Sequence, residues 1–105
     1  MVKVFASLSL AALLALPGMA LAHSPVFDCY DNGDGTISCQ GGFSDGSSAA
    51  GVTVKVLDGK GAPIEEGKLN SNSEISFKKP SGDYKVMFDG GEGHSIVLDG
   101  KQIVQ

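Results

Sequence analysis

Two cysteines, Cys29 and Cys39, flank the turn-rich segment CYDNGDGTISC and constrain the fold more than any other feature of the chain. The residues on both sides alternate between apolar and polar as strands do, and the turn signals between them centre on Asp34. A hairpin with that centre places the two cysteines directly opposite each other, with their Cβ atoms about 5 Å apart. We therefore expect a disulfide that closes a β-hairpin and stabilises it by about 2–3 kcal/mol.

The same segment contains DNGDGTI, which resembles the first half of an EF-hand calcium loop. Aligning Gly35 with the invariant glycine of that loop puts Tyr30 at its first position and Gly41 at its twelfth. Both positions require oxygen-bearing side chains, and an EF-hand also requires helices on both sides. The sequence therefore favours a solvated hairpin turn over a calcium site.

The first 22 residues have the features of a secretory signal peptide. Lys3 is followed by an apolar run over 4–16, and Ala20-Leu21-Ala22 is a typical cleavage site. The apolar run is short for a stable membrane anchor, although an uncleaved anchor is the alternative. We expect a signal peptide over 1–22, a single domain over 23–105, and a periplasmic or extracellular protein in which the two cysteines pair.

After the signal peptide, short runs rich in Val, Ile and Phe alternate with Gly, Asn, Asp and Ser turns, and no helical periodicity is sustained. Asp99-Gly100 between two apolar runs predicts a two-residue hairpin. This pattern predicts an all-β fold, a small Ig-like β-sandwich of about seven strands. The expected strands are 26–31, 36–43, 52–57, 63–69, 74–77, 83–88, 94–98 and 101–104.

Composition restricts the function classes. The chain carries 12 acidic and 8 basic residues, a net charge of −4, and one of those basic residues belongs to the signal peptide. An acidic domain argues against nucleic acid and anionic membranes as partners and mildly favours cations. No apolar stretch after residue 22 is long enough for a direct membrane span. Because no nucleophile elbow, phosphate loop or zinc motif occurs, we do not expect an enzyme.

The residue exposed by signal-peptide cleavage is a histidine, His23. A terminal histidine offers its α-amine and its imidazole Nδ1, which together can chelate one metal ion in a six-membered ring. Both groups are at least partly deprotonated near neutral pH. Such nitrogen ligands suit Ni²⁺, Co²⁺, Cu²⁺ or Zn²⁺.

The second histidine, His94, directly precedes the last long predicted strand. In Ig-like sandwiches the first strand often lies parallel to the last, so the starts of both strands lie at one end of the domain. That topology would bring His23 and His94 together, with Asp89 and Glu92 as possible oxygen ligands of one metal. The alternative is that His23 is an ordinary terminal residue and His94 an ordinary turn residue.

The chain resembles the small extracytoplasmic subunit, the L-type subunit, of energy-coupling-factor nickel/cobalt transporters. The resemblance rests on LAHSPVF after the signal peptide, FSDGS at 43–47, the V-x-V-x-D strand at 54–58, and DGGEGH at 89–94. It covers nearly all of the chain after residue 22. It implies a carboxypeptidase-regulatory-like or Ig-like β domain with a role in Ni²⁺ or Co²⁺ uptake. A membrane-embedded transporter component is the implied partner, and His23 and His94 match the two histidines of that family.

Three functions are compatible with these features. The leading expectation is an exported accessory protein that binds Ni²⁺ or Co²⁺ and assists its uptake by a membrane transporter. The second is a structural or interaction module of the cell envelope that binds no metal. The third is a periplasmic copper-binding protein, because nitrogen ligands bind Cu²⁺ more tightly than Ni²⁺.

Overall fold

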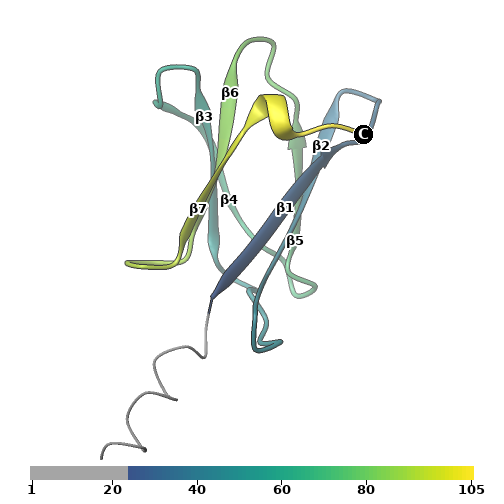
Figure 1. Cartoon of the computed structure of the whole chain (residues 1–105). Coiled ribbons are helices and arrows are strands. Elements are labelled where there is room, and N and C mark those ends of the chain that lie inside the picture. Colours follow the sequence, from purple (N-terminus) through teal and green to yellow (C-terminus); the bar gives the residue numbers. More distant parts are fainter. Residues whose placement is uncertain (1–23) are drawn as a thin grey trace, which may run out of the picture.

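The computed structural model describes residues 24–105, which form an all-β sandwich of two antiparallel sheets (Figure 1). One sheet has the strand order β1-β2-β5 and the other has the order β4-β3-β6-β7. A short 3₁₀ helix, η2, follows the last strand. The elements are β1 (Pro25–Asp31), β2 (Thr36–Phe43), β3 (Thr53–Asp58), β4 (Pro63–Lys68), β5 (Glu74–Lys78), β6 (Tyr84–Asp89), β7 (Ser95–Asp99) and η2 (Gly100–Gln102).

The expected cystine hairpin is confirmed. Cys29 in β1 and Cys39 in β2 are direct register partners, and a disulfide joins them with their Cα atoms 4.0 Å apart. Both cysteines and Phe27 are buried, whereas Val26, Asp28 and Tyr30, which alternate with Phe27 and Cys29 along β1, are exposed. This alternation follows from the pleat of the strand, which turns every second side chain toward the opposite sheet. A disulfide of this kind is typical of extracytoplasmic proteins.

The core lies between the two sheets. Strand β6 contributes Tyr84, Val86 and Phe88, every second residue, and the Phe88 side chain is fully buried. The Phe88 ring lies 5.3 Å from that of Phe27 in the other sheet, measured between centroids. The buried apolar residues are Phe27, Cys29, Ile37, Cys39, Ala49, Val54, Val56, Leu69, Phe77, Tyr84, Val86, Phe88 and Ile103.

Seven of the eight predicted strands are present, with each boundary within one residue of the expectation. The prediction of a hairpin at Asp99-Gly100 and of a strand over 101–104 is wrong. Asp99 caps η2 instead: its carboxylate accepts a hydrogen bond from the Lys101 amide, and the Gln102 side chain accepts one from the Asp99 amide. Two reciprocal side-chain bonds therefore stabilise a helical turn that the dipeptide alone does not reveal.

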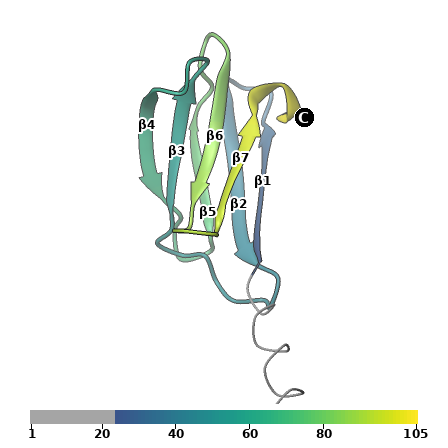
Figure 2. The ribbon, with the colours of Figure 1, turned by 60° about the vertical axis from the view of Figure 1, so that its left-hand side comes forward.

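The first and last strands run side by side in the same direction, as Figures 1 and 2 both show. The chain therefore enters the sandwich at the same end at which β7 starts. We call this the proximal end; its loops are 44–52, 69–73 and 90–94. The distal end carries loops 32–35, 59–62 and 79–83 together with the C-terminal residues 100–105.

The C-terminal residues cover the core at the distal end. Ile103 is buried, and the Val104 carbonyl accepts a hydrogen bond of 3.1 Å from the Asp31 amide at the end of β1. The last residues thus close the space between the sheets rather than extend either sheet. Within residues 24–105 no helix is long and apolar enough to cross a membrane.

Candidate metal centre

His94 lies at the proximal end, at the close of the loop between β6 and β7. Gly91 and Gly93 in this loop have φ of 97° and 78°, which only glycine adopts without strain. The tight path brings the His94 Nδ1 within 3.1 Å of the Glu92 carbonyl oxygen. The half-buried imidazole packs edge-on against Phe43, with the ring centroids 6.2 Å apart. The ring orientation is therefore determined by one polar and one apolar contact.

Phe43 connects His94 to the start of the chain. It is the register partner of Pro25, the first residue of β1. Next to this pair, the Ser24 amide donates to the Ser44 Oγ at 3.0 Å and the Ser24 carbonyl accepts from the Ser44 amide at 2.8 Å. Ser24 is thus held beside the residue that contacts the His94 ring. His23, which precedes Ser24, lies outside the described residues, and its role stays a prediction.

The two predicted oxygen ligands lie in different surroundings. Asp89 forms an ion pair with Lys55 at 3.5 Å and accepts a hydrogen bond from the Gly91 amide. It follows the inward-facing Phe88 in β6, so the pleat turns it to the outer face of the sheet. Glu92 is exposed in the loop, and its main-chain carbonyl oxygen contacts the His94 ring.

Among residues 24–105, His, Cys, Asp and Glu side chains form no group of three or more that could hold a metal ion. His94, Asp89 and Glu92 therefore do not form a complete ligand set by themselves. A pocket of about 300 Å³ lies beside His94 and is lined by Phe43, Ser47, Gly90 and His94. A metal at this pocket needs ligands in addition to the His94 imidazole.

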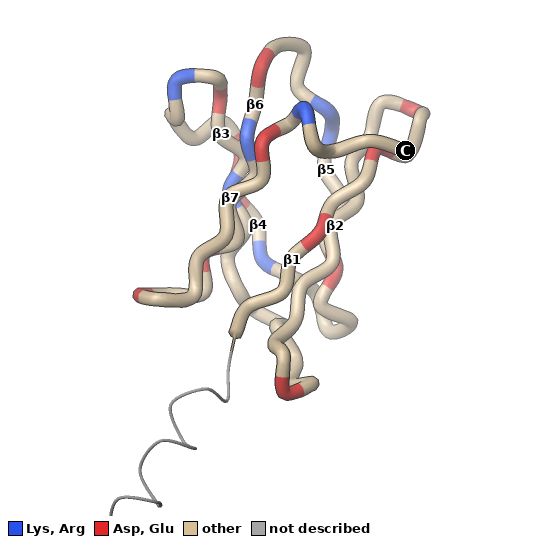
Figure 3. The backbone as a smooth tube through the Cα atoms, viewed as in Figure 1, with Lys and Arg blue, Asp and Glu red and all other residues tan. Residues whose placement is uncertain are grey.

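The two ends of the sandwich differ in charge. The proximal loops contain Asp45 and Glu92 but no lysine or arginine, whereas the distal loops and residues 100–105 contain both signs, namely Asp34, Asp83, Lys60, Lys79 and Lys101. Figure 3 shows acidic positions at both ends of the sandwich, and lysines in the loops of the distal end. The side chains of the proximal loops thus carry a formal charge of −2, against +1 (three lysines minus two aspartates) for the distal loops and residues 100–105, which mildly favours a cation at the proximal end.

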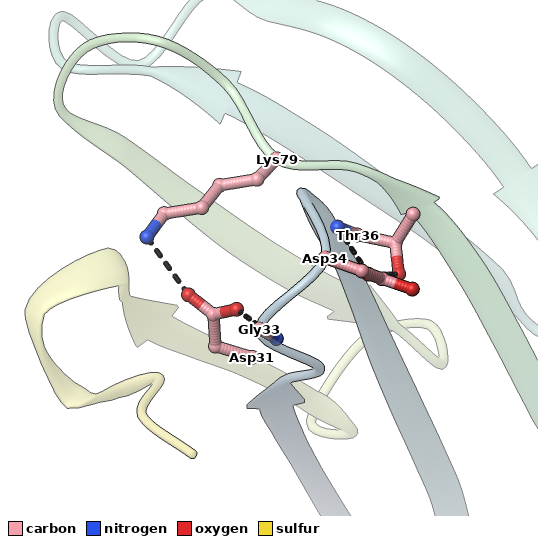
Figure 4. A network of polar contacts seen from close by, with 5 residues as sticks. All are labelled: Asp31, Gly33, Asp34, Thr36 and Lys79. Atoms are coloured by element: carbon pink, nitrogen blue, oxygen red, sulfur yellow. Dashed lines mark hydrogen bonds and ion pairs between the residues drawn. The ribbon is translucent and has the colours of Figure 1, made fainter.

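The acidic turn between β1 and β2 lies at the distal end (Figure 4). The Lys79 ammonium donates to the Asp31 carboxylate at 2.8 Å, and the Gly33 amide donates to the same group. Both hydrogen bonds lower the pKa of Asp31, and the one from Lys79 has the larger effect. Hydrogen bonds from the Thr36 hydroxyl and amide lower the pKa of Asp34 in the same way. The Asp31 and Asp34 carboxylates therefore stabilise the backbone of the turn. The contact between Asp31 and Lys79 also joins the end of β1 to the residue that follows β5.

Tyr84 is the buried polar group of the distal end. Its hydroxyl has no hydrogen-bond partner among the described residues, and burial raises the pKa of the phenol. The absence of a Cβ at Gly100 allows η2 to lie directly on the Tyr84 ring. The ring is therefore a packing element beneath the C-terminal residues.

The loop after β2 lies at the candidate site, although the sequence did not lead us to expect it there. This loop, which contains FSDGS, lies next to Ser24 through the Ser24–Ser44 hydrogen bonds and next to His94 through Phe43. The hairpin register could have revealed it, because the end of β2 must lie opposite the start of β1 once Cys29 faces Cys39.

Comparisons of the chain with protein-family models, with curated proteins and with solved structures give no match. The resemblance to the nickel/cobalt transporter subunit stays a prediction from the residues that carry it.

Proposed function

We propose that this chain is an exported accessory protein that binds one Ni²⁺ or Co²⁺ ion at the proximal end and assists its uptake by a membrane-embedded transporter component. One observation carries the proposal: Ser24 and the His94 ring both lie beside the β2 terminus, at Phe43 and Ser44. By covalent geometry alone, the Cα atom of the residue before Ser24 lies about 3.8 Å from the Ser24 Cα atom.

The contacts of His94 suit a metal ligand. When Nδ1–H donates to the Glu92 carbonyl, Nε2 carries the lone pair that binds metal. Metal-binding histidines commonly use their second ring nitrogen in this way, since the hydrogen bond fixes both tautomer and orientation. The terminal amine and imidazole of a processed His23 would add two nitrogen ligands. A set rich in nitrogen matches Ni²⁺, Co²⁺ and Cu²⁺ better than Ca²⁺ or Mg²⁺.

Export supports the proposal in two ways. The signal peptide over 1–22, once removed, creates the α-amine that the site requires. The Cys29–Cys39 disulfide is compatible with the oxidising periplasm or extracellular space where such a protein would meet its ion. The transporter partner rests on the family resemblance alone.

Isothermal titration calorimetry with Ni²⁺ and Co²⁺ tests the proposal on the protein that begins at His23. We expect one ion per chain and an affinity about 10- to 100-fold lower for His94→Ala. A protein with two extra residues before His23 should lose a similar factor, because its α-amine has moved. His23→Ala with a free terminus separates the contribution of the imidazole from that of the amine.

Equal affinity in wild type, His94→Ala and the extended protein would refute the metal site and favour the structural module. Competition between Cu²⁺ and Ni²⁺ tests the copper alternative. Since Cu²⁺ binds such ligands more tightly on intrinsic grounds, tighter Cu²⁺ binding alone does not identify the cargo. The discriminating result is which ion the purified exported protein carries from its native compartment.

A further inference from the structure

The three-stranded sheet presents a polar face on the side away from the core. Tyr30 in β1, Ser38 in β2 and Ser76 in β5 are register partners and form one row across this face. Cys29 and Phe77, which are neighbours of this row along the strands, are buried, so the pleat turns the row outward. The next row of the same face consists of Asp28, Gln40 and Glu74, all exposed. The middle of the face is therefore hydrophilic, and the Tyr30 ring, 42% exposed, is its aromatic group.

A hollow of about 180 Å³ lies over the row formed by Tyr30, Ser38 and Ser76. Besides that row, the residues that line it are Asn70, Glu74, Cys39 and Ile75. Cys39 and Ile75 pack toward the core, so the side chains that face the hollow are the polar ones and Tyr30. At roughly 30 Å³ for each water molecule in the liquid, the hollow has room for about six waters. One six-membered sugar ring is of comparable size.

Two hydroxyl groups at the floor of the hollow leave one hydrogen for a ligand. The Ser38 Oγ lies 3.0 Å from the Ser76 Oγ, and one of these hydroxyls donates to the other. The Asn32 Nδ2 donates to the Ser38 Oγ at 2.8 Å and supports the pair from the turn after β1. Two hydroxyls carry two hydrogens, and the contact between them uses one. The second hydrogen can therefore donate to a ligand oxygen in the hollow.

Asn70 and Glu74 supply a donor and an acceptor at the β5 side of the hollow. The Asn70 Oδ1 accepts hydrogen bonds from the Asn72 amide at 2.8 Å and from the Glu74 amide at 3.1 Å. These bonds orient the Asn70 side chain and leave its Nδ2 to donate elsewhere. Among residues 24–105, the Asn70 Nδ2, the Glu74 carboxylate and the Tyr30 hydroxyl have no hydrogen-bond partner. The hollow thus combines free donors with one free carboxylate.

We propose that this hollow binds one neutral sugar ring, either a free monosaccharide or a unit of a glycan chain. The exposed ring of Tyr30 offers an apolar surface to the C–H groups of the sugar. The Glu74 carboxylate can accept from two adjacent sugar hydroxyls, while Asn70 and one serine donate. The described residues that line the hollow carry one negative charge and no positive charge, which disfavours phosphates and acidic sugars as ligands.

This inference does not rest on the proposed metal function. The hollow lies on the face of the β1-β2-β5 sheet, and none of the residues that line it lines the pocket beside His94. Sugar binding should therefore persist in His94→Ala and in the presence of EDTA. Ni²⁺ binding should likewise be unchanged by substitutions in the hollow, so each proposal can fail without the other.

Two-dimensional ¹H–¹⁵N NMR of the protein that begins at His23 tests the proposal, with EDTA present. The neutral probes are cellohexaose, maltohexaose, mannohexaose and chitohexaose, and the acidic probe is hexagalacturonate, each at about 10 mM. We expect at least one neutral probe to shift the amide signals of residues 30, 38, 70, 74 and 76 in a saturable way. Hexagalacturonate should not shift them, because its carboxylates would face the Glu74 carboxylate.

The matching monosaccharides identify the source of the sugar ring. Equal affinity for the hexasaccharide and its monosaccharide assigns the hollow to a free sugar. Binding of the hexasaccharide that is about 10-fold tighter or more assigns it to a glycan chain that extends along the face. Both results support a site for one neutral sugar ring.

Substitutions of exposed side chains test the two sides of the hollow. Tyr30→Ala should weaken binding about 10-fold or more, whereas Tyr30→Phe keeps the ring and should weaken it less than about threefold. Glu74→Gln removes the charge of the acceptor and should weaken binding about 10-fold. Glu66→Gln, the same change at an exposed position of the other sheet, should leave affinity within about twofold. Circular dichroism and thermal unfolding establish that each variant is folded.

Three results would overturn the inference. The first is that none of the four neutral hexasaccharides shifts the signals of the hollow. The second is that Tyr30→Ala and Glu74→Gln bind the sugar as tightly as the wild type does, which would place the sugar elsewhere. The third is that hexagalacturonate binds as tightly as the best neutral probe, which would contradict the electrostatic argument.

Discussion

The disulfide should supply a large share of the stability of this domain. It joins two residues separated by 10 positions in the sequence. The loop-closure entropy of a loop of this length corresponds to about 3 kcal/mol at 25 °C. Small domains have a total stability of only about 5–15 kcal/mol. For a domain of this size, about 3 kcal/mol corresponds to a decrease in Tm of about 12–24 °C.

Urea unfolding of the protein that begins at His23, followed by far-UV circular dichroism with and without a phosphine reductant, measures this contribution. Reduction should lower the free energy of unfolding by about 3 kcal/mol and raise the m value, because the unfolded chain becomes more expanded. The double variant Cys29→Ala/Cys39→Ala should not respond to the reductant. A loss below about 1 kcal/mol on reduction would refute the reasoning, since the unfolded hairpin would then already be compact without the bond.

Two further predictions concern packing and charge. Gly41→Ala should destabilise the protein by about 1–3 kcal/mol in urea unfolding, because an added Cβ lies 2.9 Å from the Phe88 ring. Gly42→Ala, whose Cβ meets its nearest atom at 4.0 Å, should change stability by less than about 0.5 kcal/mol; equal effects would contradict the packing argument. Lys79→Met should raise the pKa of Asp31 toward its ordinary 3.8 in a ¹³C-detected NMR titration. Because the folded pKa is lowered, the stabilisation is fully present above the unfolded pKa, and wild type and variant should converge in stability only as pH falls through the lowered pKa of Asp31; an unchanged Asp31 titration would contradict this reasoning.

Much of the fold could be predicted because local signals agree with the tertiary arrangement. The spacing of Cys29 and Cys39 around Asp34 determines the register of the first hairpin, and period-two alternation identifies the buried face of β6. In both cases one short segment contains all the information needed. The expectation for the C-terminus failed because Asp99-Gly100 is compatible with both a hairpin and a helix cap. Lys101-Gln102 decides between them through side-chain bonds to Asp99.

The candidate site is harder to predict than the fold because topology identifies an end of the sandwich but not a ligand. β1 and β7 run side by side in the same direction, as the sequence predicted, so the start of β1 and the start of β7 lie at the same end. The same alternation that buries Phe88 places Asp89 on the outer face of the sheet, where it pairs with Lys55, and its role as a ligand stays a prediction. The position of the loop after β2 depends instead on hydrogen bonds between Ser24 and Ser44, which no periodic pattern encodes. The register of the cystine hairpin brings this loop next to the start of β1, because Pro25 pairs with Phe43 once Cys29 faces Cys39.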